Sequence, residues 1–318
     1  MSAERAIRLG ISACLLGEKV RYDGGHKLDR FITDTLGQYV EFLAICPEVE
    51  CGLGVPREAM RLVGDPASPR LLTIRTKQDL TKRMEQWASR RVQELETEEL
   101  CGFIFKSGSP SSGMERVRVH TEEGMPSRRG SGIFARVFME HFPLIPVEDE
   151  GRLHDLKFRE NFIERIFTFN RWRDAVGDDQ RVGRLVEFHT SHKLLILSHS
   201  PRHYTDMGRL VARSKEVPRK ALFAQYQALL MEALGVKSTA SKNANVLQHI
   251  LGYFKKELTA DEKKDLLEVI HSYRGGHVPL IVPITLVKHY VRKHSQPYLM
   301  EQVYLNPHPV ELQLRNHV

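Results

Sequence analysis

The chain has 318 residues, of which 41% are hydrophobic and 27% charged, and this composition is typical of a globular protein with about two domains. It contains no apolar run near the roughly 20 residues of a membrane span, and its first residues lack the apolar core of a secretion signal, so we expect a cytoplasmic protein. Four cysteines are too few for a secreted disulfide scaffold of this length, which favours metal binding or catalysis for them, and the net charge of +7 permits a polyanionic partner.

The first half of the chain alternates strand and helix patterns. Strands are predicted at residues 7–14, 39–46, 71–75 and 102–105, and helices at residues 28–36, 76–99 and 134–141. The longest of these helices places Leu80, Met84, Trp87, Val92 and Leu95 on one face. Such alternation favours an α/β fold with a Rossmann-like parallel sheet, which we assign to a first domain at residues 1–145.

The second half of the chain has a different pattern. Residues 143–151 read P-L-I-P-V-E-D-E-G, and we interpret them as an acidic linker. Helices are then predicted at residues 153–173, 180–197, 204–211, 217–234, 244–256, 259–273, 282–294 and 297–304. The sequence T-A-D-E at residues 259–262 is a capping box. The second domain, residues 152–318, is therefore predicted to be all-α.

Three loops that follow predicted strands carry reactive side chains. The first is S-A-C-L-L-G-E-K-V-R-Y-D-G-G at residues 12–25, the second is I-C-P-E-V-E-C-G-L-G-V-P-R at residues 45–57, and the third is K-S-G-S-P-S-S-G at residues 106–113. Ligands of open α/β sheets bind outside the carboxyl ends of the strands. We therefore expect these loops to meet in one site.

The four cysteines leave two interpretations open. They form no C-x-x-C pair, which disfavours a zinc ribbon, and each could be a small buried apolar residue. Cys101 begins an apolar strand, which favours the core, and Cys51 is intermediate. Cys14 and Cys46 each open a Gly-rich loop, which favours a functional role.

The polar residues of the loops are also ambiguous. Glu48 is either a solvated acid or, beside Cys46, a proton donor or base. The serines of the third loop form either an ordinary turn or an anion cradle of backbone N–H groups; they are Ser107, Ser109, Ser111 and Ser112.

The three loops, read as S-A-C-L-L-G-x-x-V-R-Y-D-G-G, C-P-E-V-x-x-G-L-x-V-P-R and K-S-x-S-P-S-x-G, together resemble the thiouracil desulfidase family over roughly the first 145 residues. The helical half resembles the YbgA-like domain, through H-K-L-L-I-L-S-H-S-P-R-H-Y and K-N-A-N-V-L-Q-H-I-L-G-Y-F-K. The combination resembles desulfidases that act on 4-thiouridine in tRNA, and so implies such a tRNA as the partner.

The resemblance implies a [4Fe–4S] cluster held by three cysteines, whose fourth iron is open to the sulfur of the thiolated base. On this chain the ligands fall on Cys14, Cys46 and position 112, where the family has cysteine and this sequence has Ser112. A serine hydroxyl is a poor iron ligand because it is a harder donor and must lose a proton of much higher pKa.

Three explanations of Ser112 follow from that departure. Serine is an engineered replacement, or another thiol such as Cys51 or Cys101 substitutes for the ligand, or the chain has lost its cluster. We favour the first, because the loop keeps every other feature of the motif. We expect the chain as written to bind the cluster poorly or not at all, and Ser112→Cys to restore it.

The resemblance further implies a non-redox reaction. The open iron polarises the C–S bond as a Lewis acid, and water activated by Glu48 attacks the carbon. Ser109 and Ser111 are implied to hydrogen-bond the base or to relay protons. Four further residues are expected either to support the site residues from behind or to contact a phosphate: Arg21, Tyr22, Asp23 and Arg57. The alternative is a local salt bridge that holds the two loops together.

Basic residues are concentrated in the helical half. We assign RNA binding to Arg171, Arg173, Lys193, Arg202, Lys255 and Lys256. Interleaved acidic residues leave solvated helix faces as the alternative. His199 and His203 have a metal-like H-x-x-x-H spacing, but Pro201 between them disfavours a shared helix, so core or surface histidines are preferred.

Three functions therefore stay open. The first is an iron–sulfur desulfidase that acts on 4-thiouridine in tRNA. The second is the same chemistry on free thiouracil or a thionucleotide, with a structural helical domain. The third is a cluster-free RNA-binding protein.

Overall fold

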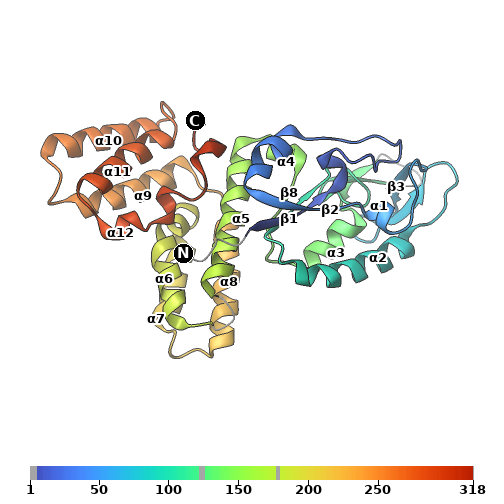
Figure 1. Ribbon diagram of the computed structural model, residues 1–318, viewed down its shortest axis with the longest axis horizontal. Coiled ribbons are helices and arrows are strands. Elements are labelled where there is room, and N and C mark those ends of the chain that lie inside the picture. Colours follow the sequence, from blue (N-terminus) through green and yellow to red (C-terminus); the bar gives the residue numbers. More distant parts are fainter. Residues whose placement is uncertain (1–5, 122–125, 177–179, 318) are drawn as a thin grey trace. The chain divides into compact units, whose positions relative to one another are not determined.

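The structure is a computed structural model that describes residues 6–121, 126–176 and 180–317 (Figure 1). The chain divides into two compact units, Met1–Asp155 and Leu156–Val318. The sequence placed the end of the first domain at residue 145, whereas the first unit continues for ten more residues because its last strand lies there. No helix among the described residues has both the length and the apolar character that crossing a membrane requires.

The first unit is built on a parallel sheet with the strand order β2-β1-β5-β8. The central strand β1 (Ile7–Ser12) pairs with β2 (Val40–Ile45) on one side and β5 (Gly102–Phe105) on the other, and β5 also pairs with β8 (Val147–Asp149). The side chains of Leu9, Ile11 and Ile104 on β1 and β5 are fully buried. The predicted α/β fold with a parallel sheet is confirmed.

Two helices cover part of this sheet. Helices α2 (Thr81–Glu94) and α3 (Ile133–His141) pack together, and Trp87 and Phe134 meet with ring centroids 5.2 Å apart. Phe138 of α3 contacts Phe103 of β5 at a centroid distance of 4.8 Å. The neighbouring strand has Gly10 at this point because a Cβ atom there would collide with the Phe103 ring.

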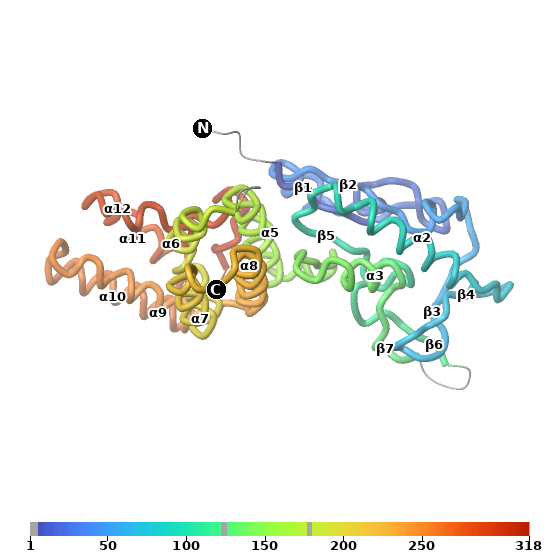
Figure 2. The backbone as a smooth tube through the Cα atoms, turned by 90° about the horizontal axis from the view of Figure 1, so that it is seen from below, coloured from blue at the N-terminus to red at the C-terminus, as the bar shows by residue number. Residues whose placement is uncertain are grey.

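A second sheet in the first unit was largely missed. Its order is β4-β3-β6-β7, and Figure 2 shows these strands gathered to one side of the parallel sheet. The strands are β3 (Met60–Val63), β4 (Arg70–Thr73), β6 (Val117–His120) and β7 (Ser127–Gly130). Only β4 was predicted, because strands of four residues with exposed charges give little periodic signal.

Other predicted elements of the first unit need correction. The interpretation of residues 143–151 as a linker is wrong, because β8 lies there and is followed by α4 (Glu150–Leu153). The acidic side chains of β8 are buried because they have partners: Glu148 pairs with Arg152 at 2.7 Å, and Asp149 caps α4 by accepting from the Arg152 N–H. The helix expected at 28–36 is a π-helical turn, Phe31–Thr35, followed by a 3₁₀ turn, Leu36–Gln38.

The second unit is helical, as predicted. Its main helices are α5 (Leu156–Val176), α6 (Val182–His199), α7 (Pro201–Ala212), α8 (Arg219–Gly235), α9 (Ala240–Leu251), α10 (Ala260–Arg274), α11 (Ile281–Lys293) and α12 (Pro297–Met300). Trp172 of α5 stacks on Tyr226 of α8 at 5.0 Å and meets Phe188 of α6 at 5.1 Å. The capping box at Thr259 and Glu262 is confirmed.

Candidate functional site

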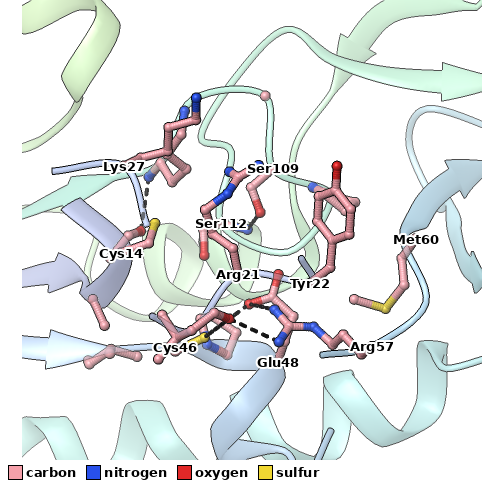
Figure 3. Close-up of a pocket in the computed structure, with 18 of the residues that line it drawn as sticks. Cys14, Arg21, Tyr22, Lys27, Cys46, Glu48, Arg57, Met60, Ser109 and Ser112 are labelled. Atoms are coloured by element: carbon pink, nitrogen blue, oxygen red, sulfur yellow. Dashed lines mark hydrogen bonds and ion pairs between the residues drawn. The ribbon is translucent and has the colours of Figure 1, made fainter. Parts of the chain in front are cut away.

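The three loops meet at one pocket of about 420 Å³ at the carboxyl ends of β1, β2 and β5 (Figure 3). Cys14 lies in a 3₁₀ turn, Ala13–Leu16, that directly follows β1. Cys46 is the N-cap residue of the short helix α1 (Pro47–Glu50), which follows β2. The loop after β5 contributes Ser109 and Ser112. The structure therefore brings together the residues that the sequence placed at separate strand ends.

Glu48 is the centre of a hydrogen-bond network in this pocket. One carboxylate oxygen accepts from the Ser111 hydroxyl at 2.6 Å, and the other lies 3.5 Å from the Cys46 thiol. The guanidinium of Arg57 approaches that second oxygen at 3.7 Å. These contacts fix the direction of the carboxylate beside the thiol.

The serine loop is ordered by its own hydroxyl groups. Ser109 Oγ accepts from the backbone N–H groups of Ser111 and Ser112 at 3.3 and 3.1 Å and lies 3.0 Å from Ser111 Oγ. Because these N–H groups are already paired within the loop, the geometry favours the ordinary turn over the anion cradle. Gly132 packs so closely on this loop that a Cβ atom there would overlap the Ser111 backbone.

Of the two roles predicted for Ser111, its surroundings favour the proton relay over a hydrogen bond to the base. Its side chain is fully buried and, unlike Ser109, is absent from the wall of the pocket. A direct hydrogen bond from Ser111 to a substrate base is therefore ruled out in this structure, because its hydroxyl is directed to Glu48. It can still hold Glu48 or relay a proton to it.

The pKa values of both thiols in the pocket are raised. Burial raises the pKa of Cys14 to about 11, although Lys106 opposes the shift. Burial and the nearby Glu48 carboxylate raise the pKa of Cys46 to about 12. Both thiols are therefore protonated at neutral pH unless a cation binds beside them, since metal ligation requires the thiolate.

The other cysteines lie outside the pocket wall. Cys51 is half-buried and donates from its thiol to the Glu48 carbonyl oxygen at 3.2 Å. Cys101 is buried just before β5, at the end of that strand remote from the pocket, as the core interpretation predicted. Neither thiol lies in the pocket wall that contains Ser112, which disfavours the second explanation of that residue.

The residues of the first loop divide into two groups. Arg21 and Tyr22 line the pocket, and the Arg21 guanidinium lies over the Tyr22 ring at 5.5 Å. Asp23 is outside the wall and pairs with Arg21 at 3.4 Å, so it has no direct contact with the site. Arg57 joins the loops, because its side chain donates to the Val20 carbonyl at 2.9 Å.

The pocket wall also contains residues to which the sequence analysis assigned no role, among them Lys27, Met60 and Lys106. Lys106 forms an ion pair with Glu150, which also accepts from the Ser107 N–H at 2.7 Å. The sequence does not reveal this pair, because residues 143–151, which include Glu150, read as a linker. The position of Lys106 at the head of the serine motif was the available signal.

The basic residues assigned to RNA binding differ in their surroundings. Arg171 is tied within the fold by a hydrogen bond to the Pro307 carbonyl at 2.7 Å. Arg173 lies over the Phe169 ring at 4.8 Å, and Lys193 over that of Tyr298 at 4.7 Å. The remaining three, Arg202, Lys255 and Lys256, are exposed. Arg171 thus has a structural contact within the fold, and its assignment to RNA binding stays a prediction.

The histidines of the helical unit lie as the sequence indicated. His199 is the last residue of α6, and Pro201 is the first residue of α7, which contains His203. The two histidines thus share no helix. His189 and His192 are buried in the core, and burial lowers their pKa to about 4 and about 3.

Comparisons with known proteins match the two halves separately. Residues 9–150 match the family model of 2-thiouracil desulfurase, and residues 193–309 match that of the protein of unknown function DUF1722. The uncharacterized protein YbgA of Escherichia coli (strain K12) is 28% identical over 161 residues, which cover 50% of this chain and 95% of that protein. A solved structure of the [4Fe-4S]-dependent thiouracil desulfidase TudS is 31% identical, with 47% of this chain and 94% of that chain covered and a TM-score of 0.40.

Proposed function

Residues 9–150 of this chain belong to the 2-thiouracil desulfurase family, and from that premise we propose that the pocket removes sulfur from a thiolated uracil base with the help of a [4Fe–4S] cluster. The proposed substrate is 4-thiouridine in tRNA. The observation that carries the proposal is the position of the Glu48 carboxylate, 3.5 Å from the Cys46 thiol in a pocket that also contains Cys14 and Ser112.

The donor set fits the cluster in two of its three positions. Cys14 and Cys46 supply soft thiolates, the ligands that iron–sulfur clusters require. The Ser112 hydroxyl is harder and far less acidic, so it does not fit, and the chain as written should hold the cluster weakly. Cysteine at this position would complete the set, because Ser112 lies in the wall of the pocket. When bound, the cluster would supply a Lewis-acidic iron for the sulfur.

The residues of the chain then have distinct tasks. Glu48, held by Ser111 and Arg57, accepts the proton from a water molecule. The water oxygen bonds to the ring carbon and becomes the carbonyl oxygen as the bond from carbon to sulfur breaks. One proton of the water leaves with the sulfur as hydrosulfide, and Glu48 returns the other to solvent. Ser109 and Tyr22 both line the pocket. In this proposal Ser109 hydrogen-bonds the base, and Tyr22 provides an aromatic face on which the pyrimidine stacks.

The helical unit supports an RNA substrate through its exposed cations. Arg202 has 87% of its side chain exposed, and Lys255 and Lys256 are also exposed. Such groups add salt-dependent affinity for a phosphate backbone. The second candidate is a free thiouracil or thionucleotide, which is favoured by the volume of the pocket, about 420 Å³, within the range of small-molecule sites.

The test compares Ser112→Cys with the chain as written after anaerobic reconstitution. We expect iron, sulfide and broad visible absorbance only in the Ser112→Cys protein, and loss of the thiobase absorbance when it is incubated with tRNA that contains 4-thiouridine. Equal iron and sulfide content in both proteins would contradict the assignment of position 112.

The substrate is decided by a parallel incubation. Turnover of 2-thiouracil without turnover of the tRNA would favour the second candidate. Salt-sensitive tRNA binding without turnover of either substrate would favour a cluster-free RNA-binding protein.

A further inference from the structure

A second pocket, of about 370 Å³, lies within the helical unit and contains none of the residues discussed for desulfurisation. The start of α5, the turn before α9, the end of α10 and the C-terminal segment form its wall. Its basic side chains are Lys157, Lys237, Arg315 and His317, and its acidic side chain is Glu160. Basic side chains therefore outnumber acidic ones in the wall of this pocket.

Arg315 is the buried part of this wall, with 5% of the residue exposed. One terminal nitrogen donates to the Tyr304 carbonyl at 2.6 Å and the other to Glu164 at 3.0 Å. Its Nε is 3.6 Å from Glu160, beyond hydrogen-bond range, and has no hydrogen-bond acceptor among the described residues. A buried donor without an acceptor is costly, and an oxygen atom of a ligand would satisfy it.

The first turn of α9 adds donors to the same wall. Thr239 is the N-cap residue, and Thr239 and Ala240 line the pocket. The N-terminus of a helix favours an anion because of its free N–H groups and its dipole. Just before it, the ammonium group of Lys237, another residue of the pocket wall, lies over the Phe158 ring, 3.0 Å from the centroid.

The charged groups around the pocket favour an anion over a metal ion as its ligand. Ligand atoms of Glu160, Glu164 and His308 lie within 4.8 Å of one another, as a metal site would require. The Arg315 guanidinium, however, already lies against both carboxylates. Burial and the neighbouring Glu164 raise the pKa of Glu160, so its repulsion of an anion is reduced.

We propose that this pocket binds a phosphate group, held by Lys157, Lys237, Arg315 Nε and the first turn of α9. The volume exceeds that of phosphate alone, so the rest of a nucleotide also fits. The phosphate belongs either to a small phosphorylated ligand or to an RNA backbone. This proposal is independent of the desulfidase chemistry, since it requires neither the cluster nor Glu48.

The test uses the full chain with Lys157→Gln and Lys237→Gln combined. Both lysines are exposed, so the fold should be retained, and circular dichroism checks this. Lys220→Gln combined with Lys264→Gln is the matched control, because both are exposed lysines of the helical unit outside the pocket. Calorimetric titration with inorganic pyrophosphate should show a loss of affinity of about tenfold or more in the double variant and none in the control.

A 12-nucleotide oligouridylate distinguishes the two sources of phosphate. If its affinity falls in the double variant and pyrophosphate competes with it, the pocket binds an RNA phosphate. If pyrophosphate binding alone depends on the two lysines, the ligand is a small phosphorylated molecule. Pyrophosphate affinity that is equal in all three proteins, or no binding to the unmodified chain at millimolar concentration, would overturn the proposal.

Discussion

Each unit of this protein contains a glutamate that pairs with an arginine, partly buried in the first unit and fully buried in the helical one, and the two carboxylates differ in their remaining contacts. In the first unit, Arg57 approaches Glu48 at 3.7 Å, and the other contacts of that carboxylate are a serine hydroxyl and a thiol at a pocket. In the helical unit, Glu164 is 3.0 Å from Arg315 and 3.1 Å from His199, and its side chain is only 3% exposed.

This difference shows that an ion pair by itself does not mark an active site. Glu164 has both oxygens engaged by cationic or imidazole partners and no access to solvent, so its role is structural. Glu48 has one oxygen fixed by Ser111 and the other turned to a reactive group in a cavity that can admit water and substrate. Glu48 can therefore still accept a hydrogen bond from a water molecule in the cavity, and this capacity favours a catalytic role for it.

Glu48→Gln tests the catalytic side of this comparison and should have the largest effect. In the Ser112→Cys protein, it should lower turnover by about 10²- to 10⁴-fold, the range for a lost general base, because the amide cannot accept the proton from water. Iron content should stay the same. Steady-state assays of thiobase loss measure the effect.

The control for Glu48→Gln is Glu85→Gln, which removes a half-exposed carboxylate of α2 that pairs with Arg136. Its turnover should match that of the parent. If Glu48→Gln also matches the parent, Glu48 has no part in the mechanism.

Glu164→Gln tests the structural side. It removes the closer of the two carboxylates that face the buried Arg315 guanidinium and leaves only Glu160, at 3.6 Å, and we expect a loss of about 3–5 kcal/mol in the free energy of unfolding of the helical unit. Chemical denaturation followed by circular dichroism measures it. Glu232→Gln, at a side chain with 65% exposure that faces His203, should change stability little. A comparable stability of both variants would show that the buried pair is not needed for the fold.

The smallest expected effect is a pH dependence from Glu160. Burial and the Glu164 carboxylate raise the pKa of this group in the folded state above its unfolded value. The folded state therefore binds more protons than the unfolded state, and the stability that Glu160 contributes falls as the pH rises from its ordinary value through the raised one.

Denaturation of the parent and of Glu160→Gln at several pH values between about 5 and 9 checks this sign. The free energy of unfolding of the parent should fall more steeply with rising pH than that of the variant. Parallel curves would show that Glu160 titrates as it does in the unfolded chain.

Apolar runs and turn residues determined much of the first unit from the sequence. The runs that became β1, β2 and β5 are strongly apolar, and their parallel arrangement brings the loops with Cys14, Cys46 and Ser112 to one edge. In the helical unit, the local T-A-D-E signal was enough for the capping box. These features depend on residues close in the chain or on a general property of parallel sheets.

Other features were decided only by contacts between distant residues. Strand β8 is acidic and reads as a linker, yet it joins the sheet because β5 pairs with it and Arg152 neutralises Glu148. Ser111 points to Glu48, 63 residues earlier, and Arg315 reaches Glu164, 151 residues earlier. A hydrogen bond of such separation leaves no periodic pattern, because the geometry that selects it exists only after the core has formed.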